Sequence, residues 1–144
     1  MIKLAYIDYP YKITNGAIKQ FYDKTALDLD SVLYEYLLAY REIPKGSDDI
    51  KVTALMKRVC PKILAAEFFH AIFKAENSCV SIDEVQDAMS MVSGRYNPEA
   101  DECSHPWPLV MVKLAYEVDE YKFNNITNAK KKADLSGNTE AKKN

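Results

Sequence analysis

The apolar residues of this chain recur mainly three and four positions apart, which is the spacing of an amphipathic helix. The pattern predicts about six helices, over residues 17–26, 28–42, 47–59, 63–74, 82–92 and 106–123. Pro44 and Pro61 separate neighbouring helices, because proline lacks the backbone N–H and restricts the residue before it. The fold class that follows is mainly α, in one domain over residues 1–128.

Ser, Thr and Asp residues stand where several of these helices should begin. Their side-chain oxygens accept a hydrogen bond from a backbone N–H of the first turn, which has no partner inside the helix. The predicted N-caps are Thr14, Asp28 or Asp30, Ser47 or Asp48, and Ser81 with Glu84 in a capping box.

The N-terminal residues follow a different pattern. Residues 2–13 are rich in β-branched and aromatic side chains in partial alternation, with Ile2, Leu4 and Tyr6 on one side. Pro10 interrupts the alternation, because proline cannot donate a hydrogen bond to a sheet. We therefore predict a short N-terminal β segment or a small hairpin.

Two segments lack a helical pattern. Residues 93–104 contain glycine, proline and several acids, which is typical of a loop. In residues 129–144 Leu135 is the one bulky apolar residue, so we predict a disordered basic tail there.

The net charge of −2 divides unevenly along the chain. Residues 129–144 hold five of the 19 Lys and Arg and two of the 21 Asp and Glu. The body before them therefore has 14 basic and 19 acidic residues, a net charge of −5. Binding to duplex DNA relies on clustered Lys and Arg that displace counterions, so this acidic body argues against a nucleic-acid partner.

The cysteines and the apolar runs bear on where the protein acts. Cys60, Cys79 and Cys103 are odd in number, and Met1 leads into alternating residues rather than into an apolar signal segment. We expect reduced thiols that pack as small apolar side chains in the cytoplasm. No apolar run approaches the roughly 20 residues of a membrane span, so we expect no membrane partner.

Few residues offer chemistry for catalysis or metal binding. Glu67 and His70 lie three apart on one helix face and could be metal ligands or an acid–base pair, but a site would need a second such pair. Cys103-Ser104-His105 offers at most two zinc ligands, without the spacing of a four-ligand site. The chain also has no Gly-rich phosphate loop and no nucleophile turn. We therefore expect a protein without catalytic activity, cofactor or metal.

Aromatic residues indicate contact with another protein. Tyrosine combines a large apolar face with a polar hydroxyl, which suits a binding surface as well as the edge of a core, and the chain has ten tyrosines. The candidate protein-binding residues are Tyr34, Tyr36, Tyr40, Phe68, Phe69, Phe73, Tyr116 and Tyr121.

The sixth helix has two apolar lines. Leu109, Val112 and Tyr116 form one line, and a second runs through Leu114 and Val118. Two lines on one helix predict either deep burial or a surface shared with another subunit.

Three stretches of the chain occur in a particular order. They are Tyr9–Ile18 followed by Phe21 and Asp28-Leu29, then Ala65–Ala71 followed by Ser81–Val85, then Trp107-Pro108-Leu109. In this order, in chain length and in its basic tail, the sequence resembles the tail assembly chaperones of long-tailed, non-contractile bacteriophages. The first stretch is similar to the strand pair and Gly-Ala-hydrophobic helix start of that group. The second is similar to its apolar helix followed by a capped helix.

The resemblance implies a function in tail morphogenesis. Chaperones of this group bind the tape measure protein and keep it soluble until tube subunits polymerise around it. We therefore expect a homo-oligomer in the host bacterial cytoplasm that is not part of the mature virion. The group often makes a longer, frameshifted product that recruits the tail tube protein. Because lysine codons are A-rich, Lys130, Lys131 and Lys132 are the candidate frameshift position.

A small phage or plasmid regulatory protein that binds nucleic acid through a helix-turn-helix is the alternative. Such a protein needs a basic recognition helix. The nearest candidates are Lys51, Lys57, Arg58 and Lys62, around the break at Pro61.

Overall fold

The computed structural model describes residues 1–4, 7–91 and 106–143, with side chains up to Leu135. It is mainly helical and has a short antiparallel strand pair, as the sequence predicts. The strands are β1 (Ile2–Leu4) and β2 (Ile7–Tyr9). The helices are α1 (Asn15–Thr25), α2 (Leu29–Glu42), α3 (Asp49–Val59), α4 (Lys62–Lys74), α5 (Ile82–Met91) and α6 (Trp107–Lys143).

The strand pair forms one edge of the body. Ile2 pairs with Tyr9, and Leu4 pairs with Ile7. Ile2, Leu4 and Tyr9 are buried, whereas Ile7 is exposed, so the alternation places one face of the pair on the core. The Tyr9 ring stacks on Phe73 of α4, with ring centroids 4.6 Å apart.

Helix α4 is the centre of the body. It packs against α1 on one side and against α5 on the other. Eight of its 13 residues are buried, because a helix between several neighbours needs apolar side chains on most of its faces. The Lys12 N–H donates to the Ile72 carbonyl at 3.0 Å, which ties the segment after β2 to the last turns of α4.

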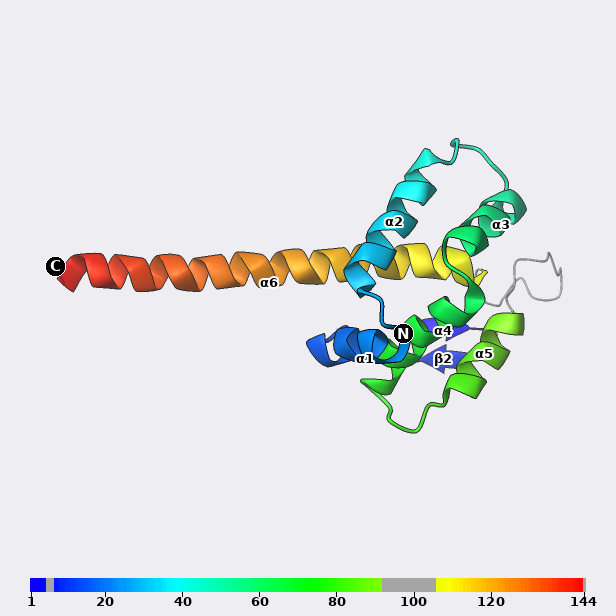
Figure 1. Ribbon diagram of the computed structural model, residues 1–144, viewed down its shortest axis with the longest axis horizontal. Coiled ribbons are helices and arrows are strands. Elements are labelled where there is room, and N and C mark those ends of the chain that lie inside the picture. The colour runs from blue at the N-terminus through cyan, green and yellow to red at the C-terminus, as the bar shows by residue number, and fades with distance from the viewer. Residues whose placement is uncertain (5–6, 92–105, 144) are drawn as a thin grey trace.

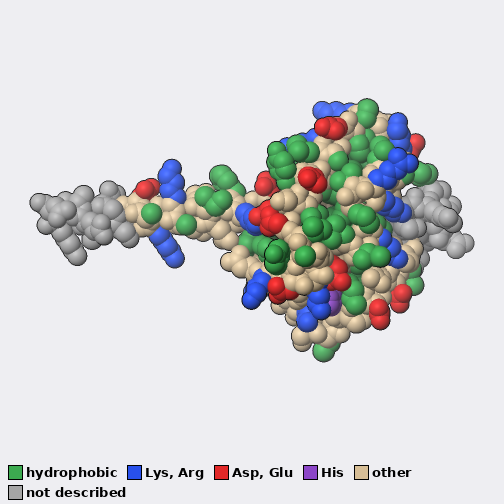
Figure 2. Space-filling model, in the orientation of Figure 1, with side chains coloured by type: hydrophobic (Ala, Val, Ile, Leu, Met, Phe, Trp, Pro, Cys, Tyr) green, Lys and Arg blue, Asp and Glu red, His purple; other side chains and the backbone are tan. Residues whose placement is uncertain are grey.

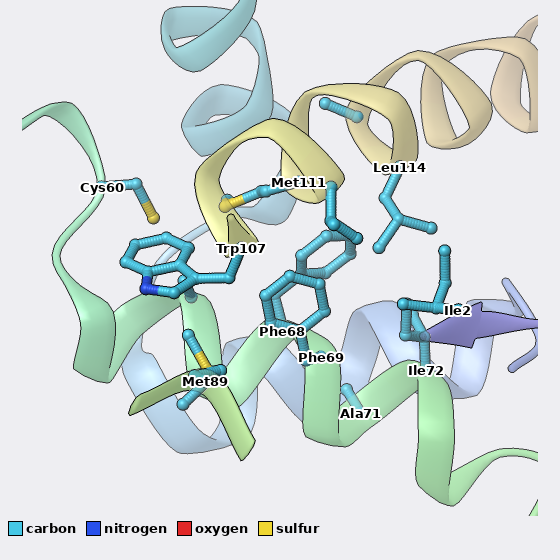
Figure 3. Close-up of a cluster of buried hydrophobic side chains, with 14 of the residues drawn as sticks. Ile2, Cys60, Phe68, Phe69, Ala71, Ile72, Met89, Trp107, Met111 and Leu114 are labelled. Atoms are coloured by element: carbon cyan, nitrogen blue, oxygen red, sulfur yellow. The ribbon is translucent and has the colours of Figure 1, made fainter. Parts of the chain in front are cut away.

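The start of α6 closes the core from another side. Trp107 is 1% exposed, and its indole lies between Cys60 and Met89, while Met111 lies over the Phe68 and Phe69 rings (Figure 3). Burial raises the pKa of the Cys60 thiol to about 12. Cys60 is therefore protonated at neutral pH and packs as a small apolar side chain.

Three of the predicted N-caps make the expected hydrogen bond. Thr14 Oγ1 accepts from the Ala17 N–H at 3.0 Å, Asp48 Oδ1 from the Lys51 N–H at 2.8 Å, and Ser81 Oγ from the Glu84 N–H at 3.1 Å. Asp28 occupies the N-cap position of α2, but its side chain makes no cap hydrogen bond.

The structure differs from the prediction at the end of α6. The helix does not end near Phe123 but continues to Lys143, and its second half projects from the body as a single helix (Figure 1). Residues 124–136 contain no proline or glycine, and Ala, Lys and Leu favour helix, so nothing local stops the helix before Gly137. The side chains of residues 128–135 are all exposed, as they would be in a tail without a core of its own. The predicted loop at 93–104 lies outside the described residues.

The length of α6 does not make it a membrane span. Its 37 residues extend about 55 Å at a rise of about 1.5 Å per residue. Among the residues that the structure describes, no helix combines the length and the apolar character that crossing a bilayer requires.

Candidate protein-binding site

An open groove lies between α2 and the part of α6 that leaves the body. Its volume is about 930 Å³. Its floor includes the buried residues Leu37 and Val118, and its rim carries exposed apolar side chains and charges. The exposed apolar residues of the groove are Tyr34, Leu38, Tyr116, Phe123 and Ile126.

Helical periodicity explains why α2 presents apolar side chains to the groove. Tyr34 and Leu38 are four residues apart and therefore share a face of the helix. Tyr34 is 66% exposed and Leu38 is 40% exposed. Tyr36 lies on another side of α2 and is buried in the core, whereas Leu33 and Leu37 are buried beside the exposed pair and also line the groove. α2 is thus apolar on two sides, and the described residues leave the side with Tyr34 and Leu38 partly uncovered.

α6 contributes the other wall of the groove. Tyr116 is 41% exposed, and beyond it Phe123 and Ile126 are 68% and 69% exposed. In Figure 2 apolar side chains are visible on the projecting helix and on the nearby surface of the body. Because monomeric proteins seldom leave such side chains clustered in water, the cluster indicates an interaction surface.

Charged side chains frame the apolar part of the groove. Lys122 of α6 forms an ion pair with Asp30 of α2. The Arg41 guanidinium lies over the Tyr116 ring, 5.7 Å from its centroid. Tyr116, and to a smaller extent the Asp119 carboxylate, raise the pKa of Arg41 above its usual range. Each of these two contacts joins α2 to α6 along the groove.

Half of the predicted binding residues belong to the core instead, so the prediction is wrong for them. Tyr36, Phe68, Phe69 and Phe73 have no measurable exposure. The Tyr36 hydroxyl donates to the Pro108 carbonyl at 2.5 Å, inside the body. The three phenylalanines lie on α4, where neighbours on several sides leave no free face.

The other four predicted residues lie at or near the surface. Tyr34 and Tyr116 line the groove. Tyr40 is partly buried and packs against the core. Tyr121 is also partly buried, and its hydroxyl donates to Asn15 Oδ1 at 3.3 Å, so it ties α6 to the start of α1.

Sequence reasoning missed three groove residues, Leu38, Phe123 and Ile126. Leu38 lies beside the core stripe of α2, and the helical wheel alone does not show where that stripe ends. Phe123 and Ile126 lie at the predicted end of the last helix, where side chains were not assigned to any face. Phe123 follows Tyr116 by seven residues, and Ile126 follows Phe123 by three. This helical spacing is the signal that could have indicated a continuing apolar stripe.

The candidates for metal binding do not assemble into a metal site within the described residues. His70 is buried, and its Nε2 lies 2.9 Å from the Val80 carbonyl oxygen, just before α5. Among the described residues, no group of three or more His, Cys, Asp or Glu is placed to hold a metal ion. Cys103 and His105 lie outside the described part of the chain.

The basic residues of the helix-turn-helix alternative lie on α3 and at the start of α4. Lys51 and Arg58 are exposed on α3, while Lys62 hydrogen-bonds to Ser90 of α5. α4, the helix after the break at Pro61, is the buried centre of the body. A helix with most of its faces in the core cannot enter a DNA groove.

No model of a protein family, no curated protein and no solved structure matches the chain. A functional proposal therefore rests on the groove and on the sequence resemblance.

Proposed function

We propose that this protein is a bacteriophage tail assembly chaperone that binds an apolar helical segment of the tape measure protein in the α2–α6 groove. The observation that carries the proposal is the exposed apolar strip, Tyr34, Leu38, Tyr116, Phe123 and Ile126, in an open groove between two helices. The choice of a tail chaperone over other binding proteins is supported by the order of the three sequence stretches.

The groove suits a helix as its ligand. An amphipathic helix lays its apolar face in a groove through side chains spaced at three, four and seven residues. The two walls offer aromatic and aliphatic contacts, and aromatic residues contribute strongly to binding surfaces. Arg41, Asp119 and Glu120 at the rim fix the orientation of a helix that carries charges of both signs at its edges.

Binding of this kind keeps a client soluble. A long helical protein exposes apolar stripes until its final partners cover them, and such stripes associate with one another in water. A chaperone that covers them reversibly lowers the concentration of free apolar surface and requires no catalysis. We further propose that the protein acts in the host cytoplasm and is released before the virion is complete.

The test is co-expression with the large tape-measure-like protein encoded nearest the gene of this chain. We expect the wild-type chain to make that protein soluble and to co-purify with it. The variant Tyr34→Ser, Leu38→Ser removes the α2 wall of the groove and should weaken capture by at least about tenfold, because central apolar contacts dominate such interfaces.

The matched control is Ile50→Ser, Ile63→Ser. These residues are 61% and 73% exposed and lie outside the groove, so the variant loses equivalent apolar surface elsewhere. It should capture the client as well as the wild type does. An equal loss of client capture in both variants would show that binding is nonspecific hydrophobic association. A tape measure protein that is soluble alone would show that it does not require a chaperone.

A longer frameshifted product that recruits the tail tube protein is a second part of the proposal. Lys130, Lys131 and Lys132 lie on the exposed part of α6, so residues added after them would begin away from the body. The coding sequence decides this part. It should contain a slippery A-rich run at these codons and an open overlapping frame beyond them.

A further inference from the structure

The projecting half of α6 carries an ordered surface stripe. Tyr116, Asp119, Phe123, Ile126, Lys130 and Ala133 follow one another at spacings of three, four, three, four and three, and all six are exposed. This spacing is the a/d pattern of a coiled coil, in which one stripe of a helix faces a partner helix. The same stripe begins inside the body at Leu109 and Val112, which pack in or against the core.

An isolated helix of this kind is poorly stable in water. Most helical stability in proteins comes from packing of an apolar face, and a helix without such packing is marginal. Phe123 and Ile126 line the open groove beside α2 and are still about two-thirds exposed, and the second half of α6 projects from the body as a single helix (Figure 1). Among the residues that the structure describes, none covers this stripe as its pattern requires.

The stripe is complementary to itself when one copy is reversed. In an antiparallel pair centred between Phe123 and Ile126, Phe123 of one copy lies opposite Ile126 of the other. Asp119 then lies opposite Lys130, and Tyr116 lies opposite Ala133. Each apolar residue meets an apolar residue, each acid meets a base, and the largest side chain meets the smallest.

A parallel pair of the same helices would have the opposite result. It would place Asp119 against Asp119 and Lys130 against Lys130, and like charges at a seam destabilise a coiled coil. Charge thus selects the antiparallel arrangement, which also has the two-fold symmetry of most homodimers.

We propose that two copies of this chain pair through antiparallel α6 helices, with Phe123 and Ile126 at the centre and Asp119–Lys130 ion pairs on either side. The proposal stands on α6 and does not depend on the identity of any client. Since Tyr116, Asp119, Phe123 and Ile126 also line the groove, the second copy covers the same surface that the proposed client occupies. The proposed client and the second copy therefore compete for this surface.

The test is the molar mass of the full-length chain in solution, measured by light scattering or sedimentation over a range of concentrations. We expect the wild-type chain to be a dimer. Lys130→Asp and Asp119→Lys each create two like-charge pairs per dimer and should weaken dimerisation at least about tenfold. The double variant Asp119→Lys, Lys130→Asp restores opposite charges and should restore the dimer.

Two controls make the result specific. Lys131→Asp makes the same change of charge one position away, off the stripe, and should leave the dimer intact. Lys130→Asp leaves the contact between Asp119 and Arg41 within its own chain unchanged, so its effect reports the second copy alone. Circular dichroism checks that each variant keeps its helices.

A wild-type chain that stays monomeric up to roughly 100 μM would overturn the proposal, because a specific dimer seam should bind more tightly than that. A dimer that neither single variant weakens, or that the double variant does not restore, would overturn the antiparallel register. Client capture is tested separately through Tyr34 and Leu38 on α2. Failure of the dimer therefore leaves the proposed function standing, and the reverse also holds.

Discussion

The Tyr36 hydroxyl donates to the Pro108 carbonyl at 2.5 Å, in a position closed to solvent. This bond joins the middle of α2 to the first turn of α6. A buried hydrogen bond of this kind contributes about 1 kcal/mol to stability. Although both are tyrosines of one helix, Tyr36 and the exposed Tyr34 therefore differ in what their hydroxyls contribute.

We predict that Tyr36→Phe lowers the free energy of unfolding by about 1 kcal/mol, because it removes a buried hydrogen bond between α2 and α6. Tyr34→Phe is the matched control. Its ring is 66% exposed, and the change should alter the free energy of unfolding by less than about 0.5 kcal/mol. Urea unfolding followed by circular dichroism measures both, and equal effects would contradict the role of the hydrogen bond.

The buried tyrosines also predict how stability depends on alkaline pH. Burial, with the nearby carboxylates Glu84 and Glu117 respectively, raises the pKa of Tyr9 and of Tyr11 from 10.0 to about 12. Burial raises the pKa of Tyr36 further. In the unfolded chain these tyrosines lose their protons near pH 10, whereas in the folded chain they keep them to higher pH.

The stabilisation from these groups is therefore complete below about pH 10 and is lost as the pH rises towards 12. We predict a fall in the free energy of unfolding across this interval, measured by urea unfolding at successive pH values. Tyr11→Phe should make the fall shallower, since it removes one of the shifted groups. A flat profile between pH 10 and 12 would show that the tyrosines titrate alike in both states.

At the scale of elements, the helix starts offer a test of local sequence effects. Asp48 and Asp28 both occupy N-cap positions, but only Asp48 accepts a hydrogen bond from a backbone N–H of its helix, that of Lys51 at 2.8 Å. Both carboxylates interact with a helix dipole, so the pair differs mainly in this bond.

We predict that Asp48→Ala lowers the free energy of unfolding by about 1 kcal/mol and that Asp28→Ala lowers it by less. Chemical denaturation of the two variants beside the wild type measures the difference. The reverse order would mean that the Asp28 hydrogen bond from the Ser31 hydroxyl, at 3.2 Å, contributes more than the cap at Asp48.

At the scale of the whole molecule, the described core is one continuous cluster from β1 to α6. Trp107, the single tryptophan, lies inside it between Cys60, which follows α3, and Met89 of α5 (Figure 3). We predict that tryptophan fluorescence and circular dichroism report the same unfolding transition, because a single core unfolds as a unit. Two separated transitions would show that α6 leaves the body before the other helices unfold.

Removing the indole should be costly for the same reason. Trp107→Ala is expected to lower the free energy of unfolding by about 3–5 kcal/mol, the range for large buried aromatic residues. Because this variant has no tryptophan fluorescence, its unfolding is followed by circular dichroism. The exposed Phe123 serves as control, since Phe123→Ala removes an aromatic ring that the folded monomer does not bury.

The sequence by itself determined the elements whose causes are local. Hydroxyl and carboxylate caps at Thr14, Asp48 and Ser81 place helix starts, since their partners lie three residues away. The alternation in the first residues shows which face of the strand pair is apolar. The helical spacing of apolar residues over 63–74 is local as well, and α4 spans Lys62–Lys74.

Only the tertiary structure decided which apolar faces are core and which are surface. Periodicity gives the directions of side chains around one helix, whereas burial depends on which other elements lie in those directions. Phe68 and Phe123 are both aromatic residues on helices, yet one is enclosed by neighbours and the other lies where α6 has left the body. The groove exists because α2 and α6 meet across more than 70 residues of chain, a contact that no local pattern specifies.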